Sequence, residues 1–179
     1  MFFVLAGKMA FTVEQIIITR LLREIASVKS IALGEGIPQL LIPHLPEDGR
    51  VLSLEDVTEE AAAVDLIIVE ATEVSRTGDI CLPYEGAPQL QKEKARQWIV
   101  ATSHFNQRGE GKLVETVTTE PQCPGCADLI ITELGVIAVS ELGFELREVA
   151  PGRSSDDVRA AVQTSLHVAD DIDLMKLGS

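Results

Sequence analysis

Aromatic side chains are scarce in this chain of 179 residues, which contains one tryptophan, one tyrosine and five phenylalanines. A core must therefore be built from aliphatic residues, and a hydrophobic content of 46% is sufficient for one domain of this length. No run of about eighteen or more apolar residues occurs, so the sequence predicts no membrane-spanning helix. The apolar start is short and lacks a charged lead-in. We interpret it as a first strand or as an extension over residues 1–10, with Met9 as an alternative start, rather than as a signal peptide.

Basic residues are also few, because 15 lysines and arginines stand against 28 acidic residues, giving a formal net charge of −13. Nucleic acids are bound through clusters of positive charge, and the sequence shows no such cluster. The composition argues against nucleic-acid binding and, more weakly, against association with anionic membranes. A polyanionic ligand would need the backbone amides of a glycine loop, or cations from a partner chain.

The three cysteines are an odd number without a disulfide framework, which favours a reducing, cytoplasmic location. Cys123 and Cys126 have the spacing of half a zinc site or of a redox pair. No second pair of this kind exists, and Cys81 with His104 or His167 would have to complete four zinc ligands from distant positions. We expect a plain loop with free thiols and no metal ion, and keep a thiol or metal protein as an alternative.

Hydrophobic patterning indicates alternating helices and strands in the first half of the chain and clustered strands in the second. Strands are expected at residues 30–33, 50–53, 64–71, 95–102, 112–119, 128–139 (two strands divided at Gly135) and 143–149. Helices are expected at 12–27, from Pro38 onward, at 56–64 (or a compact connection) and at 154–164, and loops at 73–88 and 121–126. This order predicts one α/β domain over residues 1–179, with an open, mostly parallel sheet, flanking helices and a late β-rich portion.

The pattern that points most directly to a site lies where the first two expected strands end. Gly34 and Gly36 follow the first strand, and a glycine pair of this kind favours a tight turn over a phosphate loop. Ser53 and Asp56 follow the second strand and fit a helix cap, with Glu55 as a carboxylate in the first turn. Because strand ends that meet helix starts are common ligand sites, we expect any covalent chemistry here.

Four segments in series resemble the β subunit of family I coenzyme A transferases, the group that contains the 3-oxoacid CoA-transferases. They are the Leu-Gly-x-Gly-Ile-Pro loop at residues 33–38, the Val-Asp strand and its following turn at 64–66 and 73–79, the Asp-x-Ile-Ile-Thr-Glu-Leu segment at 127–134, and the Leu-x-Glu-x-Ala-Pro-Gly segment with its helix at 146–159. The segments keep the family's order over most of the chain from residue 12 onward. The resemblance implies the fold of that family.

The resemblance also implies a reaction, in which coenzyme A moves between a short acyl or 3-oxoacyl thioester and a carboxylic acid. In that family a glutamate just after the second strand is the nucleophile, and Glu55 takes this position. The implied residues for substrate and CoA are Gly34, Gly36, Ile37, Pro38, Ser75 and Gly78. Coenzyme A would be a substrate, no permanently bound cofactor is expected, and the implied partners are an α-type subunit, acyl-CoA and a small carboxylic acid. The implied assembly is a hetero-oligomer or homo-oligomer.

The sequence departs from the family pattern around this position. Asp56 and Val57 replace an Asn-Gly pair, several tens of residues that follow in the family are absent, and Glu70 stands in the place of a glycine. An alternative function is therefore a non-catalytic subunit of the same fold that serves binding or assembly. His104 matches a family histidine, for which we expect a structural role in a turn.

Overall fold

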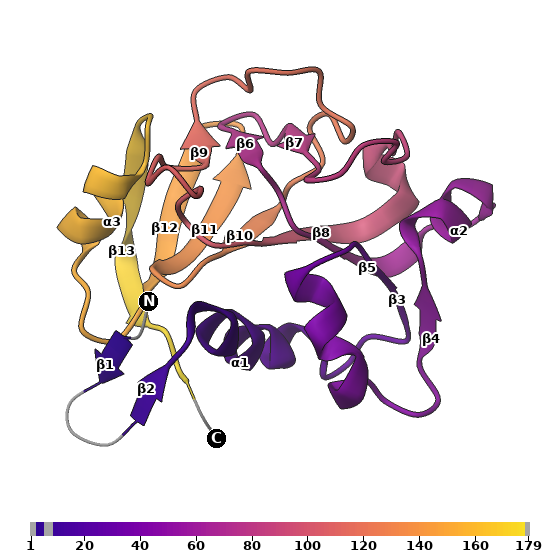
Figure 1. Ribbon diagram of the computed structural model, residues 1–179, viewed down its shortest axis with the longest axis horizontal. Helices are drawn as coiled ribbons and strands as arrows, with labels where there is room; N and C mark the ends of the chain where they lie inside the picture. The colour runs from indigo at the N-terminus through magenta and orange to yellow at the C-terminus, as the bar shows by residue number, and fades with distance from the viewer. Residues whose placement is uncertain (1–2, 6–8, 178–179) are drawn as a thin grey trace.

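The computed structural model describes residues 3–5 and 9–177, and its main feature is a large mixed sheet (Figure 1). The strands of this sheet are β3 (Ser30–Leu33), β4 (Arg50–Leu52), β5 (Val64–Val69), β8 (Ala95–Ala101), β10 (Leu129–Ile131), β11 (Gly135–Ser140), β12 (Gly143–Val149) and β13 (Leu166–Leu174). In the described part of the chain they form an eight-stranded sheet in the order β13-β12-β11-β10-β8-β5-β3-β4. The pairings from β4 to β10 are parallel, β11 is antiparallel to both its neighbours, and β13 is parallel to β12. The sequence prediction of an α/β fold with a mostly parallel sheet is confirmed.

One face of the sheet is covered by α1 (Val13–Ile25) and by the 3-10 helix η1 (Ile37–His44) (Figure 1). The expected capping box is present, because the Thr12 hydroxyl accepts from the amide of Gln15 and the Thr12 amide donates to the Gln15 side chain. The helix expected from Pro38 is a 3-10 helix rather than an α-helix. Pro43 lies inside it, and a proline lacks the amide that an α-helix would require there.

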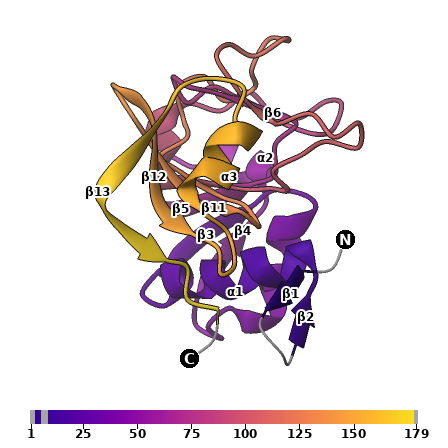
Figure 2. The same cartoon turned by 90° about the vertical axis from the view of Figure 1, so that its left-hand side faces the viewer.

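The other face carries a small three-stranded sheet of β6 (Glu73–Ser75), β7 (Ile80–Cys81) and β9 (Leu113–Val114), together with α3 (Ser155–Ala161). Figures 1 and 2 show these elements opposite α1. A short helix, α2 (Leu54–Glu59), follows the edge strand β4, and the single 3-10 turn η2 (Lys92–Lys94) leads into β8. The two strands β1 (Phe3–Leu5) and β2 (Met9–Phe11) pair antiparallel outside the main sheet.

The central strands are apolar on both faces because both faces are covered. In β5, Leu66 and Ile68 pack in the cluster under α1, whereas Ile67 and Val69 pack in the cluster on the opposite face. This arrangement explains the nearly continuous apolar run that the sequence showed at this strand. Among the described residues, no helix is both long and apolar enough to cross a membrane.

Two sequence predictions of local structure are wrong, and one strand was not predicted. Residues 73–88 were expected to be loop but contain the β6–β7 hairpin, which is closed by hydrogen bonds between Ser75 and Asp79 and buries the side chains of Val74 and Ile80. The strand expected at 112–119 is only the two residues of β9, because the amide and hydroxyl of Thr118 bind the Glu73 carboxylate instead of a neighbouring strand. Strand β13 was missed because it is acidic and largely exposed at the sheet edge.

Candidate active site

The carboxyl ends of the parallel strands β3, β4, β5 and β8 lie along one edge of the sheet. The first three are followed by Gly34, Ser53 and Glu70, and the connection after β8 leads through residues 102–112. In open α/β sheets this edge is where ligands bind. The edge therefore brings together the glycine loop and Glu55 of the sequence prediction with two residues that it did not assign, Glu70 and Lys112.

Glu55 lies in the first turn of α2, directly after the strand β4. The cap expected from the sequence is confirmed, because the Ser53 hydroxyl accepts from the Asp56 amide at 3.1 Å and the Asp56 carboxylate accepts from the Ser53 amide at 3.2 Å. The Glu55 side chain is exposed, and its carboxylate has no hydrogen-bond or ion-pair partner within the described part of the chain. The helix cap thus holds the backbone of Glu55 in place and leaves the carboxylate open to a ligand.

Tyr84, the only tyrosine of the chain, lies near Glu55. Burial, and then the negative charges of Glu55 and Glu35, raise the pKa of Tyr84 to about 12. The phenol is therefore protonated at neutral pH and is able to donate a hydrogen bond beside the two carboxylates.

The glycine loop after β3 is closed by the side chain of Glu70. Gly36 has φ = 81°, a conformation that favours glycine, and a methyl group at this position would overlap the Glu70 Oε2 atom. The same oxygen accepts a hydrogen bond from the amide of Ile37 at 3.0 Å. The Gly34 amide donates to the carbonyl of Ile68 at 2.9 Å, and Pro38 has no amide proton. Two of the backbone donors that the sequence prediction offered to a ligand are consequently used within the chain.

The other two residues predicted to bind substrate, Ser75 and Gly78, belong to a different part of the fold. They lie in the β6–β7 hairpin of the small sheet and not in the glycine loop after β3. The buried Ser75 hydroxyl donates to Asp79 Oδ2 at 2.7 Å, and Asp79 Oδ1 accepts from the Gly125 amide at 2.9 Å. Although burial acts in the opposite direction, hydrogen bonds from Ser75, Gly125 and Thr77 lower the pKa of Asp79. These contacts join the hairpin to the loop at residues 121–126.

All three cysteines are buried and free. The pKa values of Cys123 and Cys126 are both raised to about 12, mainly by burial, so both thiols are protonated at neutral pH. Over the part of the chain that the structure describes, no group of three or more histidine, cysteine or acidic side chains is placed to hold a metal ion. The geometry favours the plain-loop interpretation over a reactive thiol pair.

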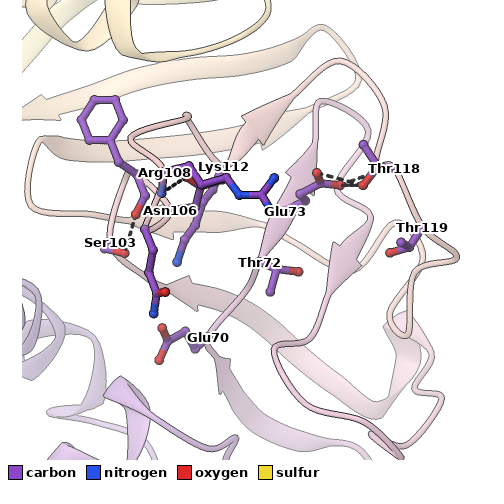
Figure 3. Close-up of a pocket in the computed structure, with 11 residues that line it drawn as sticks. Glu70, Thr72, Glu73, Ser103, Asn106, Arg108, Lys112, Thr118 and Thr119 are labelled. Atoms are coloured by element: carbon purple, nitrogen blue, oxygen red, sulfur yellow. Dashed lines mark hydrogen bonds between the residues drawn. The ribbon is translucent and has the colours of Figure 1, made fainter.

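A pocket of about 540 Å³ opens at the same edge, between the connection after β5 and the loop after β8 (Figure 3). Glu70, Thr72 and Glu73 line one side of this pocket. Lys112 and Arg108 extend over it from the other loop, as Figure 3 shows. This pocket is absent from the sequence prediction, because Lys112 was interpreted only as the first residue of a strand and Glu70 only as a replaced glycine.

A cluster of buried polar side chains lies beside the pocket at the ends of β8 and β10. Its members are Thr102, His104, Lys112, Thr132 and Glu133. The Lys112 ammonium donates to the Thr102 hydroxyl at 2.7 Å, and that hydroxyl donates to the carbonyl of Ala71 at 3.1 Å. The cluster thus ties the loop after β8 to the loop after β5.

His104 has the structural position that the sequence analysis expected. Its amide donates to the Glu133 carboxylate at 2.8 Å, and Nδ1 lies 3.3 Å from the Thr132 hydroxyl. Burial is the main cause that lowers the pKa of His104 to about 4, so the ring is neutral at physiological pH. Burial also raises the pKa of Glu133, against the opposing effect of the His104 amide.

Comparison with known proteins agrees with the motifs. No family model matches the chain. A curated protein of Bacillus subtilis (strain 168), "Probable coenzyme A transferase subunit beta", is 32% identical over 113 residues, which is 59% of this chain and 52% of that protein. The match therefore spans about half the length of this relative.

Solved structures with the same fold include the decarboxylase AibA/AibB, with a TM-score of 0.75, 16% identity and coverage of 94% of this chain and 90% of that one. The acyl-CoA transferase YdiF of E. coli O157:H7, in a thioester complex with CoA, has a TM-score of 0.74 at 15% identity, covering 97% of this chain and 44% of that one. Glutaconate coenzyme A-transferase of Acidaminococcus fermentans has a TM-score of 0.68 at 12% identity, covering 94% and 90% of the two chains.

The fold of this chain is that of the coenzyme A transferases. Within that class, the chain resembles the β subunit in sequence, which confirms the resemblance drawn from the four motifs. The same fold also supports a decarboxylase, so the reaction has to be argued from the site.

Proposed function

We propose that this chain is a β-type subunit of a coenzyme A transferase that moves coenzyme A between a short acyl or 3-oxoacyl thioester and a carboxylic acid. The observation that carries the proposal is the placement of Glu55, at the carboxyl end of β4 with an exposed carboxylate that binds no other described residue. Coenzyme A acts as a substrate in this proposal, and the three free cysteines fit a cytoplasmic location.

The proposed reaction divides one acyl exchange into easier steps. The Glu55 carboxylate attacks the thioester carbonyl, the C–S bond breaks, and a mixed anhydride and CoA thiolate form. The thiolate then attacks the glutamyl carbonyl of the anhydride, releasing the first carboxylate and leaving a glutamyl-CoA thioester. A second carboxylate attacks that thioester and reverses the sequence, which regenerates Glu55 and yields the new acyl-CoA.

A partner subunit of the α type is part of the proposal, because the surroundings of Glu55 are acidic. Glu35 and Asp56 lie in adjacent loops and turns. The cations beside α2, Lys94 and Arg50, are already bound to the carbonyls of Thr58 and Glu60 and to the Glu60 carboxylate, so an anionic substrate would gain from cations of a partner. Exposed apolar side chains of η1 and of the edge strand β4, namely Leu40, Ile42 and Val51, offer a surface for such a partner at the same end of the sheet.

The test is intact mass spectrometry after incubation with acetoacetyl-CoA and reduction with borohydride. A glutamyl thioester is reduced to an alcohol, so the proposal predicts a small mass loss that peptide mapping places at Glu55. The incubation is performed with the chain alone and with any subunit that co-purifies. Glu55→Ala is expected to remove the mass change without unfolding the protein, whereas Glu35→Ala, another exposed carboxylate near Tyr84, is the matched control. An unmodified Glu55 in both samples contradicts the proposal.

The second candidate is a non-catalytic binding or assembly subunit, and one observation favours it. The Ile37 amide, a backbone donor in the glycine loop after β3, is already bound by Glu70. A transferase site needs such donors when negative charge develops on the thioester oxygen. This candidate predicts that acyl-CoA leaves the protein unmodified even when the partner is present.

A further inference from the structure

The side chain of Lys112 is a buried cation that forms no ion pair among the described residues, although the charges of Glu70 and Glu133 act on it from a greater distance. It is 8% exposed, and its ammonium donates to the Thr102 hydroxyl at 2.7 Å. No carboxylate forms an ion pair with it anywhere in residues 3–5 and 9–177. A lysine ammonium has three donors, and only one of them is used here. An ammonium in this position is costly to keep unless an anion joins it.

The Lys112 side chain borders the 540 Å³ pocket and reaches into it from the loop after β8 (Figure 3). Thr102 fixes the position of the ammonium, since its own hydroxyl donates to the Ala71 carbonyl at the end of β5. Arg108 lies on the rim of the same pocket, and its guanidinium has no ion-pair or hydrogen-bond partner among the described residues. Two cations that face one pocket are notable in a chain with net charge −13.

We propose that this pocket binds the carboxylate group of a small organic acid, with Lys112 as the cation that anchors it. The inference rests on the proposed function, in which such an acid accepts coenzyme A. Lys112 would hold the acid before its carboxylate moves to the thioester at Glu55, which lies outside this pocket. The volume is within the range of small-molecule sites and is suited to a short acid rather than to a whole coenzyme A.

The charges of the pocket favour a carboxylate over a phosphate. The carboxylates of Glu70 and Glu73 line the wall opposite the two cations, so the ionised side chains balance one another. Glu73 is held by the amide and hydroxyl of Thr118, and Glu70 by the amide of Ile37. A single negative charge placed at Lys112 is compatible with these fixed carboxylates, whereas a multiply charged phosphate would be repelled by them.

Isothermal titration calorimetry of the full chain, in the form in which it purifies, tests the inference with the singly charged acids acetoacetate and propionate as probes and phosphate as the control anion. We expect at least one acid to bind, and Lys112→Met to weaken that binding by at least about tenfold, because it removes a buried charge partner. Lys29→Met removes an exposed lysine and the same net charge, and is expected to change the affinity less than about twofold. Absence of binding by either acid, equal binding to the wild type and Lys112→Met, or tighter binding of phosphate overturns the inference.

A second measurement keeps the test valid if Lys112→Met does not fold. The wild-type chain is acetylated with an N-acetoxysuccinimide reagent, and the rate at each lysine is followed by peptide mapping. The acid is expected to slow acetylation of Lys112 and to leave that of Lys29 unchanged; equal rates with and without acid overturn the inference.

The two proposals also fail in distinguishable ways. Glu55 does not line this pocket, so Glu55→Ala is expected to leave acid binding intact while it abolishes the thioester adduct. Acid binding without an adduct at Glu55 contradicts only the transferase reaction, and an adduct without acid binding contradicts only the assignment of this pocket.

Discussion

Replacing Lys112 by methionine should make the ligand-free protein more stable, although it removes a hydrogen bond. Methionine replaces the aliphatic part of the side chain as far as Cε and lacks only the terminal nitrogen. The substitution loses the contact to the Thr102 hydroxyl, a bond to a charged group worth about 1.5–3 kcal/mol. It also removes an unpaired buried ammonium, whose desolvation costs several kcal/mol.

The balance of these two effects is a gain in the free energy of unfolding of about 1–2 kcal/mol for Lys112→Met at neutral pH. Thr102 is not left unpaired by the change, because its hydroxyl still donates to the carbonyl of Ala71. For a chain of this size the gain corresponds to a rise in melting temperature of about 2–8 °C. When a functional group is kept at a cost to stability, replacing it is expected to stabilise the protein and to abolish ligand binding.

The pH dependence gives the sharper test of this reasoning. Burial lowers the pKa of Lys112 in the folded state below the usual range of a lysine, and the negative charges of Glu70 and Glu133 only partly offset this effect. Between the folded and unfolded pKa values the unfolded chain binds more protons, so wild-type stability rises with pH in that alkaline window. The advantage of Lys112→Met should therefore shrink as the pH rises toward the unfolded value.

Urea unfolding, followed by the fluorescence of the single and fully buried Trp98, measures both effects at neutral and alkaline pH. Lys29→Met is the control for the loss of one positive charge. A Lys112→Met variant that is less stable than the wild type at neutral pH would refute the argument. So would a stability difference that does not change with pH, because the pKa of Lys112 would then be the same in the folded and unfolded chains and burial would not disfavour the ammonium.

Three further predictions concern the surroundings of the site. Gly36→Ala should lower the free energy of unfolding by about 2–3 kcal/mol in urea titrations, because a methyl group at position 36 overlaps the Glu70 carboxylate and the φ of 81° adds strain. The loss should be smaller when Glu70→Ala is also present, and equal losses in the two backgrounds contradict the overlap. Glu55→Gln should lower the pKa of Tyr84 in an alkaline absorbance titration of this only tyrosine, and an unchanged pKa would separate the two side chains. Arg20→Met should cost about 2–4 kcal/mol in the same unfolding assay, since it leaves Glu24 without its partner and leaves Glu148 only the longer contact to Arg23 at 3.7 Å. A loss below about 1 kcal/mol would show that the ion pairs of Arg20 contribute little.

The parts of the fold that were predicted from the sequence are those in which local pattern and burial agree. The helix α1 has both its cap and its apolar face, and β5 and β8 are covered on both faces, so their composition alone marks them as buried strands. The β6–β7 hairpin has strands too short to show a period. Strand β13 alternates weakly because its acidic side chains face solvent at an edge, where charge protects against pairing with other chains.

In the candidate site, too, some residues have a local signal in the sequence and others do not. Glu55 and the glycine loop could be proposed from the sequence because each follows its strand directly, and a cap or a glycine pair is a local signal. The pocket with Lys112 was not found, because it depends on two loops that are far apart in the sequence, after β5 and after β8. Whether a lysine is buried, and whether a carboxylate comes within ion-pair distance of it, is decided by tertiary packing and has no local pattern.

Glu70 connects the two proposals, and its chemistry argues that they belong to one site. As the residue that replaces a glycine, it fills the space beside Gly36 and binds the Ile37 amide, so a reaction at Glu55 has one backbone donor fewer for a developing oxyanion. The same side chain lines the pocket of Lys112, where its charge acts on the ammonium. A carboxylate at position 70 therefore removes an oxyanion donor from one side of the loop while it sets the electrostatics of the acid pocket on the other. For CoA transfer to proceed on this chain, the protonated Tyr84 near Glu55 and a partner subunit are the donors that would best replace the Ile37 amide, which is a physical reason to expect an active site shared between two chains.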